Sequence, residues 1–560
     1  MEPLAKNEET IPDDTNTSGA NDLDKISIPL SKLQFVLVIA AVNAAFMLSA
    51  LDGTIVSTAV PSIVLEFGNQ DRASWIGSAF LLSGAASDIL WGRLAQVFGR
   101  RWPFLTSLLL FAVGSVFCAA STSMDMLIIA RFVTGLGSGG IFCLSTIIIS
   151  DVVSLRDRGS YQGTLGITFG IASILGPVLG GAFSDNLSWR WCFWINIPIV
   201  VFSSLVFLFC NIPSPNELLL SKFKKIDKIG AVLVFATTII LLLPIECGGN
   251  VWAWNSSPVI ICFILSPILI IITVWWQTKA EYPLIPADLF ADSSVLPLLL
   301  MTIFFAAIFF AGIFYVTQFF QVVNNMTATK AGLQQFPNII SSVITTILSG
   351  IYCTKFLSYL PFIYIGPIFM ITGSVLISTF QINTPLAHQI GYLFIFGIGT
   401  GSILQVRILG VQASVQSAQV ATVTAVSNAC NALGGTLGIA IVGSIFTNKF
   451  TQLVSTNSNL AVFVAQAKNN LGLDLDLTQP LQTVEILKAL PNQTAQIVDA
   501  IEDVKDAFVG AFRISFLSMV PMAGVILMCA FFIRDNMKLK HEKYEERVAE
   551  EVLVELVIAS

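Results

Sequence analysis

Long apolar runs alternate with short polar segments along most of the chain. Fourteen runs are each long enough for a helix that crosses a bilayer, which needs about 20 mostly apolar residues. The runs cover 34–60, 73–91, 103–121, 124–150, 160–183, 191–211, 229–246, 258–276, 295–318, 332–351, 361–381, 388–408, 418–447 and 509–533. This pattern predicts an all-α polytopic membrane protein with 14 transmembrane helices.

The spacing of the runs divides the chain into two halves. Six runs lie within 34–211 and six within 295–533, and the linker 212–294 carries an extra hairpin at 229–276. We expect two pseudo-symmetric six-helix bundles with a substrate site near the midplane between them, as in many transporters. The polar, acidic residues 1–33 are expected to be a disordered cytoplasmic N-terminus, and 534–560 a cytoplasmic tail.

Composition changes this picture little but excludes several classes of protein. Apolar residues make up 55% of the chain and charged residues 11%, whereas soluble domains carry about 25% charged residues. The deficit excludes a globular enzyme with a membrane anchor. The sequence has no P-loop and no Ser/His/Asp set, and its two histidines are far apart. We therefore expect no enzyme activity, no cofactor, no metal and no nucleic-acid partner, in a monomer that works in the lipid bilayer.

A basic connection between the second and third runs indicates the orientation. The segment GRLAQVFGRR contains Gly92, Arg93, Gly99, Arg100 and Arg101. Glycine permits the tight turn, and the positive-inside rule places the arginines on the cytoplasmic side, with both termini. The cations expected in inside loops are Arg93, Arg100, Arg101, Arg156, Arg158, Lys222, Lys224, Lys225, Lys228, Lys279, Lys355 and Arg407.

The loops expected outside carry few cations and four candidate glycosylation sequons. The sequons begin at Asn186, Asn255, Asn325 and Asn492, which agrees with this orientation. The outside segment 448–508 is long, and its part 493–508 has apolar positions on one helical face. We expect either a helix on the outer membrane surface or over the outer mouth, or a poorly ordered loop.

Few ionisable residues stand inside predicted spans, where charges are costly and usually functional, and two of them are candidates for chemistry. Asp52 lies in the first run and Arg131 in the fourth. An acid and a base at depth suit proton coupling, since such a group must take up and release a proton as its surroundings change. The alternatives are that Asp52 caps a break in its helix and that Arg131 is a structural anchor near the interface.

Several motifs resemble those of one family. The segment 92–101 resembles the loop signature G-x-L-a-D-x-x-G-R-[KR] of the major facilitator superfamily. Residues 51–61 and 131–140 resemble the first-helix and fourth-helix motifs of its drug–proton antiporters, and 170–181 resembles their fifth-helix motif G-x-x-x-G-P-x-x-G-G, with Gly176, Pro177, Gly180 and Gly181. The resemblance covers about 34–533 and is closest to the fourteen-span branch, in particular to fungal toxin and multidrug efflux pumps of the aflatoxin-efflux type.

The chain departs from these motifs at two places. Gln96 occupies the acidic position of the loop signature, whose acid takes part in charge pairs that close the cytoplasmic side in relatives. We expect a weaker closure or one that uses another acid, for which Asp88 is a candidate; a polar capping role for Asp88 is the alternative. In the fifth-helix motif the first glycine is two residues further away, unless Ala172 replaces it.

The resemblance implies proton-coupled efflux of a lipophilic small molecule, such as a fungal secondary metabolite, toxin or drug, with Asp52 and Arg131 in proton transfer. An importer of a nutrient or iron chelate and a non-transporting sensor are the alternatives. We expect the plasma membrane, with the vacuolar membrane as the alternative. Few buried charges suggest a neutral or weakly charged substrate. Candidates for its path, chosen by position, are Phe46, Phe169, Gln318, Phe319, Gln321, Gln405, Asn428 and Asn431.

Overall fold

The regular secondary structure of the described residues is helical. The computed structural model describes residues 30–67, 72–73, 75–210, 226–248, 252, 254–457 and 495–540. The N-terminal half consists of α1 (Lys32–Phe67), α2 (Trp75–Phe98), α3 (Arg101–Ala119), α4 (Met124–Val152), α5 (Arg158–Asn186), α6 (Trp191–Trp194) and α7 (Asn196–Phe209).

The linker and the C-terminal half follow in the same way. The linker contributes α9 (Lys228–Cys247), α10 (Ser257–Lys279) and the short η2 (Ala287–Phe290). The C-terminal half consists of α11 (Val295–Val322), α12 (Ala328–Leu333), α13 (Phe336–Phe356), α14 (Leu360–Ile377), α15 (Leu386–Leu404), α16 (Val406–Ala413), η3 (Ser417–Gln419), α17 (Val420–Thr456) and α20 (Ala495–Ala530).

The number of membrane-crossing helices agrees with the predicted fold class. Thirteen segments of the described chain are long and apolar enough to cross a membrane. The remaining predicted span is α2, whose serines, glycines and Asp88 lower its hydropathy. Its 24 residues still rise about 36 Å, and it packs along α4. The all-α polytopic fold is confirmed, with fourteen helices when α2 is included.

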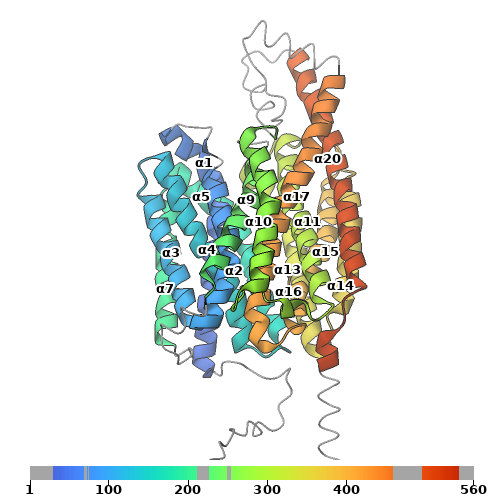
Figure 1. Cartoon of the computed structure of the whole chain (residues 1–560). Coiled ribbons are helices and arrows are strands. Elements are labelled where there is room, and N and C mark those ends of the chain that lie inside the picture. Colours follow the sequence, from blue (N-terminus) through green and yellow to red (C-terminus); the bar gives the residue numbers. More distant parts are fainter. Residues whose placement is uncertain are drawn as a thin grey trace, which may run out of the picture.

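Two helices extend beyond the predicted apolar runs. The helix α17 continues to Thr456 and α20 begins at Ala495, so both ends of the predicted outside loop 448–508 are helical. In Figure 1 the first part of α20 stands upright beyond the bundle and does not lie along a surface. A helix that leaves the membrane keeps its internal hydrogen bonds, so the apolar run underestimates its length. Residues 458–494 lie outside the described residues.

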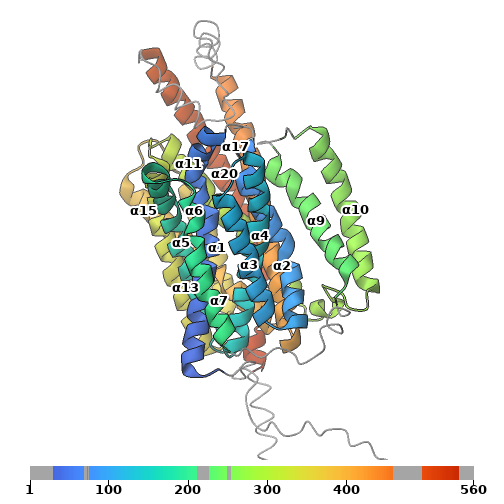
Figure 2. The same cartoon turned by 90° about the vertical axis from the view of Figure 1, so that its left-hand side faces the viewer.

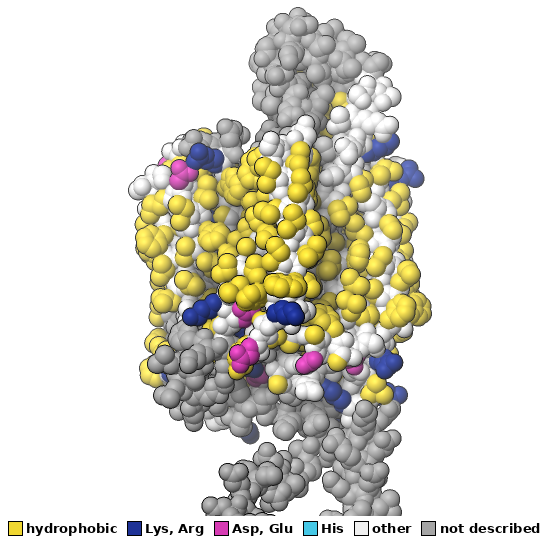
Figure 3. Space-filling model, viewed as in Figure 1, with side chains coloured by type: hydrophobic (Ala, Val, Ile, Leu, Met, Phe, Trp, Pro, Cys, Tyr) yellow, Lys and Arg dark blue, Asp and Glu magenta, His cyan; other side chains and the backbone are white. Residues whose placement is uncertain are grey.

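The extra hairpin lies on one side of the bundle (Figure 2). The helix α9 packs against α2 and α17, whereas α10 packs mainly against α9. Apolar side chains of α10 are therefore widely exposed, for example Ile264 (61%) and Ile271 (69%). Figure 3 shows the apolar side chains as a broad belt with charged side chains near its margins, which is the surface that a bilayer requires.

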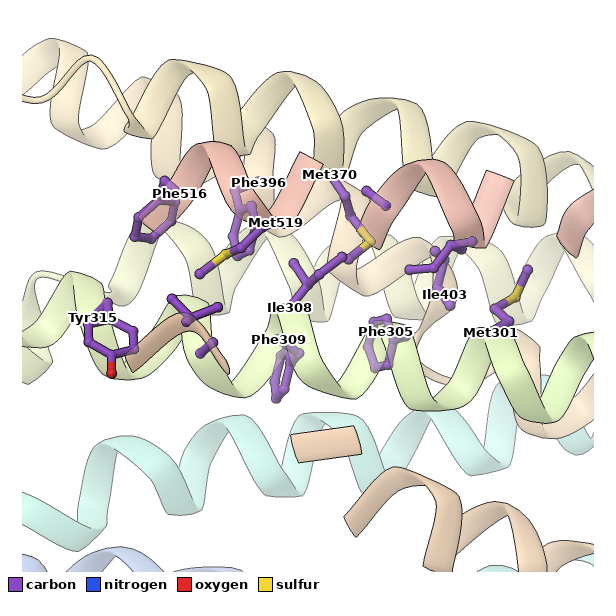
Figure 4. Packing of buried hydrophobic residues seen from close by; sticks show 14 of the residues in the cluster. Met301, Phe305, Ile308, Phe309, Tyr315, Met370, Phe396, Ile403, Phe516 and Met519 are labelled. Atoms are coloured by element: carbon purple, nitrogen blue, oxygen red, sulfur yellow. The ribbon is translucent and has the colours of Figure 1, made fainter. Parts of the chain in front are cut away.

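The two halves have separate cores and meet along few helices. One apolar cluster lies within α11–α20 and another mainly within α1–α7. In Figure 4, Met370, Phe396 and Ile308 pack together inside the C-terminal half. Contacts between the halves join α5 to α13 and α2 to α17. We call this contact surface, together with the smaller contacts of α17 with α4 and of α16 with α5, the seam.

The two ends of the bundle hold different connections. We call the end that holds the connection between α2 and α3 the basic end, and the end that holds the connection between α5 and α6 the opposite end. The residue limits of the predicted domains remain predictions. The expectations for 1–29 and 541–560 lie outside the described residues.

Candidate functional site

Asp52 of α1 and Arg131 of α4 meet inside the N-terminal half. Their side chains are 0% and 1% exposed and form an ion pair between Arg131 Nη1 and Asp52 Oδ2. Asn196 Nδ2 donates to Asp52 Oδ1 at 3.0 Å and also lies 3.1 Å from Ser115 Oγ. The fold thus brings together two ionisable residues that are far apart in the sequence. An amide from α7 binds the other carboxylate oxygen of Asp52.

The guanidinium of Arg131 has further partners within the same half. Its Nε donates to the carbonyl of Ile76 at 3.0 Å. Its Cζ lies 4.1 Å from the ring centroid of Phe80, a distance typical of a cation–π contact. The network therefore joins α1, α2, α4 and α7. Removing one partner of a buried pair leaves an uncompensated charge and costs about 3–5 kcal/mol.

This pair lies nearer the opposite end than the basic end. Asp52 is 20 residues after the start of α1, which is about 30 Å along the helix. Arg131 is seven residues after the start of α4, about 10 Å from that end. The protein shields groups at this depth from water. A change in their charge therefore has to be accommodated by a rearrangement of the surrounding helices.

The glycines of the fifth-helix motif pack α5 against α1. A Cβ at Gly176 would overlap Thr54 Oγ1, and one at Gly180 would overlap Thr58 Oγ1, whereas Gly181 has nothing within 4 Å. The helix continues as one element from Arg158 to Asn186 through Pro177. These glycines therefore allow close contact within the N-terminal half and do not lie at the seam.

The connection at the basic end is held by its arginines. Gly99 has φ 82°, a left-handed conformation that glycine adopts without strain. Arg100 Nε pairs with Asp151 Oδ2 of α4 at 2.5 Å, and Arg101 donates to the carbonyl of Leu208 at 2.7 Å. The acid that pairs with Arg100 is thus Asp151 and not Asp88, whose Oδ1 is buried without a hydrogen-bond partner.

Gln96 itself connects the two halves. Arg93 donates to Gln96 Oε1 at 3.0 Å, and Gln96 Nε2 donates to the carbonyl of Ala418 at 3.0 Å. Close by, a Cβ at Gly92 would overlap Ala425 Cβ of α17. A recess of about 430 Å³ opens beside this contact, lined by Arg93, Gln96, Arg100, Pro286, Ala418, Gln419 and Thr422.

Further polar contacts cross the seam toward the basic end. Gln162 Nε2 donates to Gln412 Oε1 at 3.0 Å, and the hydroxyls of Ser160 and Thr354 lie 3.1 Å apart. A Cβ at Gly159 would lie 3.3 Å from Gly350 Cα. The halves are therefore in close contact at the basic end.

Four of the candidate path residues lie at or beside the seam. Phe169 of α5 faces Phe309 of α11, with ring centroids 6.3 Å apart. Phe46 packs on Phe142 at 4.5 Å, in a cluster that also reaches Phe169. Of the other two, Gln405 lies against Gly166 of α5, and Asn428 approaches the Cys143 thiol of α4.

The other candidates are placed differently. Gln318 and Gln321 are half-buried toward the opposite end of α11. Phe319 is fully buried in the C-terminal core, where it packs on Phe380 at 5.3 Å and Phe512 at 4.8 Å, and does not line the seam. In a helix that is apolar on all sides, the sequence pattern does not separate core positions from seam positions.

Arg407 shows the largest difference from the sequence expectation. It was expected in an inside loop, but it is 4% exposed and lies within the apolar segment Leu386–Ala413. Its Nη2 donates to Asn431 Oδ1 at 2.8 Å, which places the candidate Asn431 beside it. The apolar residues that continue from Ile408 to Val411 are the signal that could have revealed this burial.

Three of the candidate glycosylation sites are accessible. Asn186, Asn255 and Asn325 are exposed at the opposite end, Asn186 as the last residue of α5 and the other two in connections between helices. Asn492 lies outside the described residues. Modification of these side chains remains a prediction.

Comparison with known proteins identifies the family. The sequence model described as Major Facilitator Superfamily matches residues 42–439. The efflux pump aflT of Aspergillus parasiticus is 34% identical over 440 residues, covering 77% of this chain and 84% of the relative. The MFS-type transporter ptmT of Penicillium ochrochloron is 31% identical over 526 residues, covering 92% and 88%.

Solved structures agree with the fold at low identity. The human organic anion transporter MFSD10 has a TM-score of 0.54 and 14% identity, covering 89% of this chain and 99% of that chain. The proton:xylose symporter XylE has a TM-score of 0.53 and 14% identity, covering 82% and 100%. The helices, the buried charged pair and these matches lead to one conclusion: the chain is a multi-pass membrane protein that belongs to the major facilitator superfamily.

Proposed function

We propose that this protein exports a lipophilic small molecule in exchange for protons, by alternating access between its two halves. The observation that carries the proposal is the ion pair of Asp52 and Arg131, both almost completely buried. Burying an ionisable group at this depth costs free energy, so such groups are retained mainly where they have a function. The names of the relatives, which include efflux pumps, support the direction of transport.

Protonation of Asp52 is the proposed coupling step. A proton that enters from the opposite end binds a carboxylate oxygen of Asp52, which neutralises the acid and weakens its ion pair with Arg131. Arg131 keeps its hydrogen bond to Ile76 and its contact with Phe80. Because the network joins α1, α2, α4 and α7, this change alters the packing of the whole N-terminal half. The proton leaves toward the basic end when the halves reverse their orientation.

The contacts across the seam are suited to such a reversal. The hydrogen bonds from Gln96 to Ala418 and from Gln162 to Gln412 join neutral groups. A hydrogen bond of this kind contributes about 1 kcal/mol net, so a few of them close the basic end without locking it. We place the basic end in the cytoplasm, together with both termini, and the protein in the plasma membrane.

Export and its coupling can be tested in cells that lack the gene. These cells are expected to retain a lipophilic compound that normal cells release into the medium, as measured by metabolite profiling of cells and medium. Wild-type protein should restore release, and a protonophore should abolish it. Asp52→Asn should not restore release, because the amide cannot carry the proton.

A matched carboxylate provides the control. Glu66 lies on the same helix as Asp52 but near its exposed end, where it pairs with Arg190 at 2.8 Å. Glu66→Gln makes the same chemical change and should restore release fully. Full restoration by Asp52→Asn would refute the coupling role of this residue. Starvation of the deletion strain, with no retained compound, would indicate import.

A further inference from the structure

Arg407 is a buried cation whose hydrogen-bonding groups are not all used. The side chain is 4% exposed, and Nη2 is bound to Asn431. Its Nε and Nη1 are buried and have no hydrogen-bond partner. Its Cζ lies 4.9 Å from the ring centroid of Phe305. An unpaired buried charge is costly, so this guanidinium is expected to have a partner in some step of the protein's work.

The head group of Arg407 lies next to the face of α17 that meets the N-terminal half. Its partner Asn431 is three residues after Asn428 on α17, and residues three apart share one helix face. That face reaches the N-terminal half, because Asn428 approaches Cys143 of α4. Asn431 is also 11 residues after the start of α17, about 16 Å along the helix. This depth is near the midplane, where transporters of this kind bind their substrates.

Aromatic rings connect Arg407 to the other half. Phe305 stacks on Phe309 at 5.7 Å, and Phe309 faces Phe169 of α5 at 6.3 Å. Figure 4 shows Phe309 pointing away from Phe396 and Met370, which lie in the core of the C-terminal half. When the halves separate, the surface thus exposed combines flat apolar rings with one cation.

We infer that Arg407 binds an acidic group of the transported compound, so that the substrate is an aromatic acid and carries a negative charge. A guanidinium binds a carboxylate by charge-assisted hydrogen bonds, which are stronger than those between neutral groups. The rings of Phe305, Phe309 and Phe169 would take the flat apolar part. The inference rests on the proposed function, since the site becomes accessible only when the halves move. Of the expected neutral or weakly charged substrates, it favours a charged one.

Asp88 is a buried carboxylate near this face, and its role can be distinguished from that of the substrate. It lies on α2 close enough to influence Cys143, and one of its carboxylate oxygens has no hydrogen-bond partner. If Arg407 pairs with Asp88 in another conformation, then removing the charge of Asp88 should change binding at Arg407. If Arg407 serves the substrate, then Asp88→Asn should leave the preference for an acid intact.

The test uses two probes of the same shape, anthracene-2-carboxylate and anthracene-2-carboxamide. Their binding to the purified full chain in lipid nanodiscs is followed by the fluorescence anisotropy of the anthracene. Wild-type protein should bind the acid at least about tenfold more tightly than the amide, as expected for a charge-assisted contact. Arg407→Gln should bind both equally. Asn431→Asp, which offers Arg407 a carboxylate from the protein itself, should also lose the preference but keep the cation.

Two controls make the result decisive. Arg190→Gln removes a cation from the opposite end, and both it and Asp88→Asn should keep the tenfold preference. The inference is overturned if the wild type binds the amide as well as the acid, binds neither, or if Arg407→Gln or Asn431→Asp keeps the preference. Loss of the preference in Asp88→Asn would overturn it in favour of an Arg407–Asp88 pair. Export from cells is measured separately, so the proposed function can fail or hold independently of this result.

Discussion

Two buried guanidinium groups, one in each half, have very different surroundings. Arg131 is paired with Asp52, bonded to the carbonyl of Ile76 and stacked on Phe80. Arg407 is stacked on Phe305 in a similar way but has only one amide as a hydrogen-bond partner. The first charge is compensated inside its own bundle, whereas the second is not.

The difference follows from where each side chain lies. The network of Arg131 is enclosed by helices of the N-terminal half, so all of its partners can come from that half. Arg407 lies beside the seam, where the surroundings change as the halves move in the proposed transport cycle. A charge in the first position can respond to a proton and reshape one bundle. A charge in the second position is available to a molecule that passes between the bundles.

Removing the compensated cation should have the largest effect. Arg131→Gln leaves Asp52 buried without its partner, which is expected to cost about 3–5 kcal/mol. The apparent Tm, measured by tryptophan fluorescence of the protein in nanodiscs, should fall strongly. The double variant Asp52→Asn with Arg131→Gln should lose less than the sum of the two single variants, since the two sites are coupled. Simple additivity would show that the pair does not act as a unit.

Removing the uncompensated cation should change the stability of the protein in the opposite direction. Arg407→Gln replaces a charge whose unsatisfied donors cost about 1–3 kcal/mol by a neutral amide. In the same unfolding measurement its apparent Tm should equal or exceed that of the wild type. A fall as large as that of Arg131→Gln would contradict the comparison, because it would mean that the fold itself compensates Arg407.

The smallest expected effect is a change in thiol reactivity at the seam that leaves the interior of the N-terminal half unaltered. Gly92→Ala places a methyl group against Ala425 and should weaken the closure by about 1–3 kcal/mol. Reaction of Cys430, which lies beside Arg407, with N-ethylmaleimide should then rise several-fold over wild type, as measured by mass spectrometry. Cys118, which lies beside Thr134 in the N-terminal half, should not change.

A glycine on the same helix gives the control for this measurement. Gly77 has no atom within 4 Å of where its Cβ would lie, so Gly77→Ala should leave both thiols at wild-type reactivity. Equal increases at Cys118 and Cys430 in Gly92→Ala would instead indicate general loosening of the protein.

The sequence predicts the fold and one buried pair well, because each has a strong physical signal. Apolar length defines the spans, and a charge in the middle of a span, such as Asp52, is conspicuous. Asn196 was not recognised, since a single amide at the start of an apolar run looks like an ordinary boundary residue. Its contribution depends on α7 approaching α1, which is a matter of tertiary packing.

The seam is the part that the sequence predicts least. Arg407 stands near the end of an apolar run, where a cation is typical of a cytoplasmic loop. Whether it is buried depends on how far the helical segment continues, and α16 continues to Ala413. Phe169 and Phe319 are chemically alike, yet one lies beside the seam and the other in a core. Periodicity does not separate them where a helix is apolar on every side.

The contact of Gln96 with Ala418 has a consequence for how the protein responds to ionic strength. Dissolved salt weakens attraction between exposed charges but has little effect on a hydrogen bond between uncharged groups. A closure that uses this amide, together with Gln162 and Gln412, should therefore hold equally well at low and high ionic strength. A cell exposed to osmotic stress would keep this side of the protein shut to the same degree.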